Sequence, residues 1–266
     1  MNMIHPTLES GALRERIAQL IDAGRTGAAR PLLAAARKIS LPSADISLLA
    51  ARLALRDGDP CQALQELDAA IGVSPTHPGL RKRRAEVHQL QGNLDGAARD
   101  AAEAVILDCS DTEAKAILGV TMLDLGRIAD AVGCLTEAVA AAPQAVAYRK
   151  ALATALEAGG DADAALLVLI KGVGLNPADL TLRNAAILLC MGRRDFTQAL
   201  RLAEQARVIG IADASTYGMK GHALASLGSH EEATLAYQEA LKLEPDNPYV
   251  RHLGPNLYGA LSVKPN

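Results

Sequence analysis

The stretch that decides the fold runs from residue 112 to residue 145 and reads TEAKAILGVTMLDLGRIADAVGCLTEAVAAAPQA. Its first part, Thr112 to Asp124, has apolar residues at helical spacing and predicts one helix. Gly126 permits a turn, and the segment from Asp130 to Ala140 predicts a second helix that Pro143 prevents from continuing. The stretch therefore predicts two helices joined by a tight turn.

The same arrangement recurs every 34 residues along the chain. One position of the second helix is always alanine: Ala29, Ala63, Ala97, Ala131, Ala165, Ala199 and Ala233. Seven residues later the chain again has a small residue: Ala36, Ala70, Ala104, Ala138, Gly172, Ala206 and Ala240. The turn position holds Gly24, Gly58, Gly92, Gly126, Gly160, Arg194 and Gly228. Because small side chains let two helix backbones approach closely, these columns predict tightly packed helix pairs.

These columns resemble the tetratricopeptide repeat, whose signature runs from a bulky residue and Leu-Gly through an aromatic to Ala, an aromatic, Ala and Pro. The seventh unit carries the pattern best, in Tyr217, Gly221, Leu224, Gly228, Ala233, Tyr237, Ala240 and Pro245. The resemblance covers seven ungapped units: 10–43, 44–77, 78–111, 112–145, 146–179, 180–213 and 214–247. It implies an all-α fold in which seven helix pairs form one right-handed superhelix over residues 10–247. Residues 1–9 would then be a leader, and residues 248–266 a short C-terminal cap or tail.

Composition narrows the class of protein further. Half of the 266 residues are hydrophobic and the net charge is -3, so we expect a buried core and no general attraction to nucleic acid or membranes. No apolar run approaches the length of a transmembrane helix, and the first residues do not read as a signal peptide. The four cysteines, Cys61, Cys109, Cys134 and Cys190, form no CxxC pair. We expect reduced thiols in a cytoplasmic protein of bacterial type, with a disulfide framework or metal site as the alternative.

No group of residues has the pattern of a catalytic site. The six histidines show no metal-ligand spacing such as HExxH, and Gly172-Val173-Gly174 lacks the third glycine of a phosphate-binding loop. Asp161 and Asp163 follow a turn and are expected to begin a helix as N-terminal acids. The sequence therefore predicts no enzyme activity, no cofactor and no metal.

The resemblance implies that the first helix of each unit lines a concave groove, with positions 2, 5, 6, 9, 12 and 13 facing it. The basic residues expected there are Arg52, Arg56, Lys82 and Arg83, opposed by Glu86. The apolar residues expected there are Ile117, Val120, Leu123, Leu188, Met191 and Met219. We expect a groove that is basic toward its N-terminal end and apolar toward its C-terminal end, and a solvated charged face above an apolar floor is the alternative.

Two groove chemistries known in the family do not fit these residues. Lys82 stands where chaperone-binding members have the lysine of a carboxylate clamp, but Glu86 replaces the asparagine of that clamp. The asparagine ladder of the sugar-transferase members is absent from position 6. The resemblance therefore leaves the class of groove ligand open.

Position 4, usually large and apolar in the family, is cationic in four successive units: Arg81, Lys115, Arg149 and Arg183. Cations are seldom fully buried without partners, so these side chains are expected to reach outward along the helix pair. Either they pair with Glu103, Glu137 and Glu239 of the second helices, or they form an anion-binding ridge.

Together these features predict a scaffold that binds a peptide or helix of a partner protein. The alternative is the substrate-recruiting part of an enzyme whose catalytic domain is absent from this chain, because residues 246–253 resemble a junction that precedes a methyltransferase domain in bacterial repeat proteins. Gly254-Pro255 interrupts the helix that would cover the last unit. We therefore expect either a cap formed by the tail, with Leu257, Tyr258 and Leu261, or a homodimer through the C-terminal end.

Overall fold

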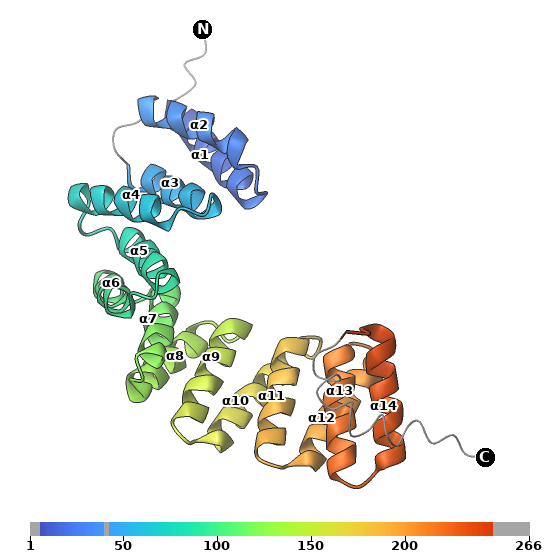
Figure 1. Ribbon diagram of the computed structural model, residues 1–266. Coiled ribbons are helices and arrows are strands. Elements are labelled where there is room, and N and C mark those ends of the chain that lie inside the picture. The colour runs from blue at the N-terminus through green and yellow to red at the C-terminus, as the bar shows by residue number, and fades with distance from the viewer. Residues whose placement is uncertain (1–5, 40–42, 247–266) are drawn as a thin grey trace. The chain divides into compact units, whose positions relative to one another are not determined.

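The computed structural model describes residues 6–39 and 43–246, and within these ranges it contains fourteen helices and no strand (Figure 1). The helices are α1 (Pro6–Asp22), α2 (Thr26–Ile39), α3 (Ala44–Arg56), α4 (Pro60–Val73), α5 (Pro78–Leu90), α6 (Leu94–Leu107), α7 (Thr112–Asp124), α8 (Ile128–Ala141), α9 (Val146–Ala158), α10 (Ala162–Leu175), α11 (Leu180–Gly192), α12 (Phe196–Val208), α13 (Ala214–Ser226) and α14 (His230–Leu243). The predicted all-α fold of seven helix pairs is confirmed. The C-terminal features expected after residue 246, including the junction, the cap and the dimer contact, lie outside the described residues.

Each turn between the helices of a pair depends on a left-handed backbone. The six turn glycines have φ between 69° and 85°, a region that glycine adopts without steric cost. In the sixth unit Arg194 has φ 59° and is the one non-glycine residue of the described chain with positive φ. The fold thus imposes the same turn on a side chain that disfavours it.

Aspartate and asparagine begin many of the helices by capping them. The side chains of Asp59, Asn93, Asp111, Asp161, Asp179, Asp195 and Asp213 accept a hydrogen bond from the backbone N–H three residues later. Such a bond satisfies one of the free donors at a helix start. The expectation that Asp161 begins a helix is confirmed, since it accepts from Ala164 N at 2.9 Å.

The invariant alanine column forms the centre of each pair, and all seven alanines have no exposed surface. Close approach is required most clearly at Gly119 of α7, where an added Cβ would lie 2.6 Å from Leu135 Cγ of α8. At Gly221 of α13 the same atom would lie 2.7 Å from the ring of Tyr237. The small-residue columns are therefore steric requirements of the helix interface.

The chain divides into two compact units, residues 1–138 and 139–266, which are described separately. In the first unit each helix from α1 to α6 packs against the next one, and α1, α3, α5 and α7 also contact one another in order. In the second unit the first helix α11 contacts both α9 and α13. The prediction of one continuous right-handed superhelix stays a prediction. Among the described helices, none has the length and apolar character needed to cross a membrane.

Candidate functional site

A single depression of about 660 Å³ runs along the first helices of the N-terminal unit. Its lining residues are Gly11, Arg14, Glu15, Ala18, Asp45, Leu48, Leu49, Arg52, Gly79, Lys82, Arg83 and Glu113. They come from α1, α3, α5 and the start of α7, and all occupy positions 2, 5, 6 or 9 of their repeats. We call this depression the inner groove. Three of the expected basic residues line it, whereas Arg56 lies exposed at the end of α3.

Ion pairs join neighbouring first helices across the inner groove. Arg14 of α1 pairs with Asp45 of α3, and Arg52 of α3 pairs with Asp22 of α1. Lys82 of α5 contacts Asp111 at 2.8 Å and Glu113 at 2.7 Å. The expectation of a basic groove is therefore corrected, because carboxylates of adjacent repeats pair with Arg14, Arg52 and Lys82.

Lys82 shows how firmly these charges are held. Burial alone would lower its pKa, but the hydrogen bonds to Asp111 and Glu113 outweigh burial and raise the pKa of Lys82. In the same network burial opposes ionisation of Asp111, yet the bonds from Lys82 and from the backbone of Ala114 lower its pKa overall. Since the ammonium group of Lys82 already pairs with both carboxylates, it is not free to clamp a ligand's carboxylate.

Glu86, the acidic residue expected in the groove, lies beside Lys82 on α5 and pairs with Arg83. Burial raises the pKa of Glu86, and the positive charge of Arg83 only partly offsets this effect. The prediction missed Asp45 and Glu113, although the sequence contained a signal for them. Each lies 31 residues after a cation at position 5, Arg14 or Lys82, which places it opposite that cation on the next first helix.

The expected apolar residues fall into three groups. Ile117, Val120 and Leu123 on α7 are half-buried, as is Met191 on α11. Leu188 on α11 is 46% exposed and offers apolar surface in the second unit. Met219 is 2% exposed and packs into the core beside α11, so the expectation that it faces the groove is wrong.

The cations at position 4 do not form a uniform row. Lys115 pairs with the expected Glu137 at 2.6 Å, whereas Arg81 contacts Asp100 at 3.4 Å in place of Glu103. Glu239 pairs with Lys242 of its own helix. The predicted salt bridge to a glutamate of the second helix is thus present for Lys115 alone among these described position 4 cations.

Arg149 and Arg183 contradict the expectation that position 4 reaches outward, since both are at least 94% buried. Arg149 Nε donates to the carbonyl of Pro143 at 2.9 Å, and Arg183 donates to the carbonyl of Pro177 at 3.0 Å. Burial lowers the pKa of Arg183. Because the turn before each helix supplies these acceptors, the guanidinium groups stay inside, and two of the four residues are lost from the proposed anion ridge.

No metal-binding group of three or more His, Cys, Asp or Glu side chains occurs in the described ranges. The four cysteines are free thiols: Cys61 and Cys109 are exposed, Cys134 is half-buried and Cys190 is buried. Burial raises the pKa of the Cys190 thiol to about 11, which makes it a poor nucleophile at neutral pH.

Comparison with known proteins bears on the family of the chain. A profile described as Tetratricopeptide repeat matches residues 19–78, 48–114 and 118–179, and one described as TPR repeat matches residues 221–253. The search of curated proteins found no match.

Solved structures with a similar fold include a tetratricopeptide repeat protein from Parabacteroides merdae ATCC 43184, at 17% identity and a TM-score of 0.62, covering 94% of this chain and 98% of that one. PilW, described as a widely conserved type IV pilus biogenesis factor, has 16% identity and a TM-score of 0.65, covering 79% of this chain and 97% of that one. YrrB, described as a TPR protein with an unusual peptide-binding site, has 19% identity and a TM-score of 0.54, covering 70% and 96%. At these identities the likeness is one of fold.

Proposed function

Because the chain belongs to the tetratricopeptide repeat family, we propose that it is a non-catalytic scaffold that holds a segment of a partner protein against the inner face of its first helices. The observation that carries this proposal is the inner groove, which consecutive repeats line with equivalent positions. A groove shared by several repeats suits an elongated ligand such as a peptide or a helix.

The contacts within the inner groove indicate the chemistry of that segment. Leu48 and Leu49 supply apolar surface, while the cations above them already have carboxylate partners. A purely acidic ligand would have to compete with Asp45 and Glu113 for these cations, whose charges the two carboxylates already balance. We therefore propose a segment that places apolar side chains on the groove floor and leaves these ion pairs intact.

Leu188 gives the proposal a test in the second unit that does not disturb the fold. It is a 46% exposed leucine on a first helix, and Leu167 on the second helix α10 is a 54% exposed leucine that serves as its control. A partner is first identified by photo-crosslinking from the inner face, and its affinity for the purified chain is then measured by calorimetry. We expect Leu188→Asp to weaken binding by about tenfold or more, as for a buried apolar contact, and Leu167→Asp to leave it unchanged. If both variants bind the partner as the wild type does, the inner face of the second unit is not the binding surface.

A further inference from the structure

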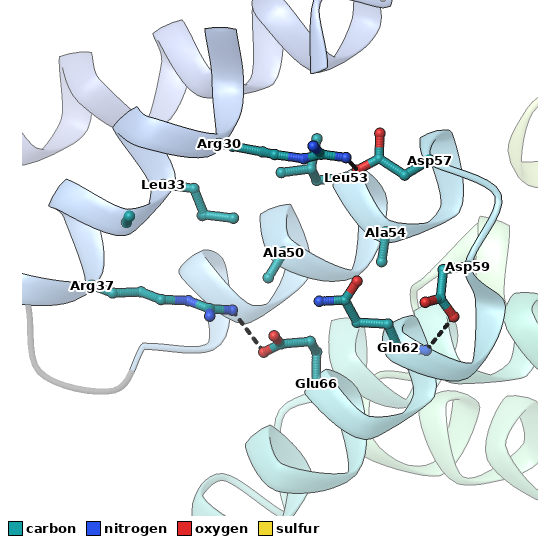
Figure 2. A pocket seen from close by; sticks show the side chains of 11 residues that line it. Arg30, Leu33, Arg37, Ala50, Leu53, Ala54, Asp57, Asp59, Gln62 and Glu66 are labelled. Carbon is teal, nitrogen blue, oxygen red and sulfur yellow. Dashed lines mark hydrogen bonds and ion pairs between the residues drawn. The ribbon is translucent and has the colours of Figure 1, made fainter. Parts of the chain in front are cut away.

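A second hollow lies on a different face of α3, between the second helices α2 and α4. It has a volume of about 570 Å³ and is lined by Arg30, Leu33, Ala34, Arg37, Ala50, Leu53, Ala54, Asp57, Asp59, Gln62 and Glu66. Figure 2 shows its floor of small and apolar side chains, with an ion pair on either side. Arg30 contacts Asp57 at 2.8 Å, and Arg37 contacts Glu66 at 2.7 Å. We call this hollow the back cleft.

The next repeat shows what fits in the equivalent place. The residues 34 positions after Ala34, Ala50 and Glu66 of the back cleft are Asp68, Arg84 and Asp100. Arg84 donates from Nε to Asp100 at 2.6 Å and from a second nitrogen to its other oxygen at 2.7 Å. Its third nitrogen donates to Asp68 at 2.5 Å. The chain thus places a guanidinium group of its own where the back cleft has only the methyl group of Ala50.

The back cleft retains the acceptor but lacks this donor. Glu66 corresponds to Asp100, and Arg37 contacts only one of its oxygens, Oε2. A carboxylate in this position can serve two guanidinium groups, since Asp100 is contacted by Arg81 as well as by Arg84. The other oxygen of Glu66 receives no hydrogen bond from the described part of the chain.

The charges around the back cleft also favour a cation. Its walls contain three carboxylates, Asp57, Asp59 and Glu66, and two arginines, so one negative charge is in excess. The floor is apolar, with Leu53 and Ala54 almost fully buried. An aliphatic stem that ends in a guanidinium group matches both features, because the stem covers the apolar floor and the planar head pairs with a carboxylate.

We propose that the back cleft binds an arginine side chain of a partner protein, seated against Glu66 as Arg84 is seated against Asp100. This site goes beyond the inner groove, since it lies on another face of α3 and shares no residue with that groove. It adds a second recognition point for a partner that reaches around the helix pair.

The test uses the full chain labelled with ¹⁵N and N-acetyl-arginine amide as the probe. N-acetyl-citrulline amide is the matched control, because its urea head has nearly the shape of guanidinium without the charge. We expect the arginine probe to shift the amide signals of Ala50, Ala54 and Gln62 saturably, and the citrulline probe to have no effect. Equal responses to the two probes would overturn the proposal, since they would show that charge recognition is absent.

Two variants test whether the probe binds in the back cleft beside Glu66. Glu66→Gln should weaken binding of the arginine probe about tenfold, the scale of one charge-assisted hydrogen bond, while replacing the exposed Glu157 of α9 by Gln should not change the affinity. Ala50→Arg should abolish probe binding, because the new side chain would fill the cleft as Arg84 fills its neighbour; circular dichroism confirms that this variant folds. If the folded Ala50→Arg variant or the Glu66→Gln variant binds the probe as the wild type does, the arginine side chain does not bind in the back cleft beside Glu66. A wild-type dimer that Glu66→Gln dissociates would overturn the assignment to a partner protein, because the arginine would then come from a second copy.

Discussion

Replacing Gly119 with alanine tests whether the repeat is held together by close helix contact. In α7 the added Cβ would lie 2.6 Å from Leu135 Cγ and 3.2 Å from Cys134 Cβ, atoms near the backbone of α8 that cannot turn away. Overpacking of this kind costs about 1–3 kcal/mol. Alanine also gains about 1 kcal/mol in helix propensity over glycine, so the net effect is a loss of roughly 0–2 kcal/mol.

Gly133 provides the matched control, because it lies exposed in α8 of the same pair and an added Cβ there meets no atom within 4 Å. The propensity gain is common to both substitutions and cancels in their difference. Gly133→Ala should therefore exceed Gly119→Ala in free energy of unfolding by about 1–3 kcal/mol, measured by urea unfolding and followed by circular dichroism. In a Leu135→Ala background the cost of Gly119→Ala should largely vanish, because the clashing side chain is gone. If Gly119→Ala is as stable as Gly133→Ala, steric closeness is not the reason for the glycine.

Three further predictions concern the turns, the buried arginines and the groove charges. Arg194→Gly should stabilise the protein by about 0.5–1 kcal/mol in thermal unfolding, because it relieves the left-handed strain of roughly 1–2 kcal/mol at the cost of some backbone entropy. Gly172→Ala should lower the melting temperature, since its Cβ would lie 2.8 Å from Arg149 Cδ, whereas Gly174→Ala in the same helix meets nothing and should not. Asp111 has its pKa lowered below 3.8 through its bonds to Lys82 and the backbone, so its stabilisation is complete above that pH and is lost as the pH falls through the folded pKa. Asp111→Asn, which keeps a helix cap, should reduce stability at pH 7 and flatten the loss below pH 4, and an unchanged pH profile of urea midpoints would exclude this role.

The fold could be predicted because the residues that each helix pair requires recur at equivalent positions of successive repeats. The alanine column is fully buried in every pair, and each turn glycine has the left-handed φ that the column implied. Where the sequence departs from its own pattern, the backbone does not follow: Arg194 adopts the glycine conformation. The packing of neighbouring pairs thus decides the backbone conformation of a turn even where the residue in it disfavours that conformation. This is the expected behaviour when stability comes from repeat interfaces.

The charges could not be predicted equally well, because their partners come from other helices. The sequence pattern indicated Lys82 as a groove cation opposed by Glu86, whereas its partners in the structure are Asp111 and Glu113. It also placed Arg183 outside, although a carbonyl of the preceding turn draws it in. A long side chain can point in more than one direction from its backbone, and the surrounding hydrogen-bond acceptors decide which direction it takes.

Comparison of equivalent positions across repeats recovers part of this missing information. Position 7 of the repeat is Ala50 in one unit and Arg84 in the next, on the same face of the same kind of helix. Where the long side chain is present, it joins Asp68 and Asp100 and fills the space between the second helices. Where it is absent, a cleft opens beside Glu66. In a repeat protein, one unit can therefore show the chemistry that its neighbour lacks. The contacts of Arg84, 34 positions after Ala50, are the reason we propose an arginine side chain as the ligand of the back cleft.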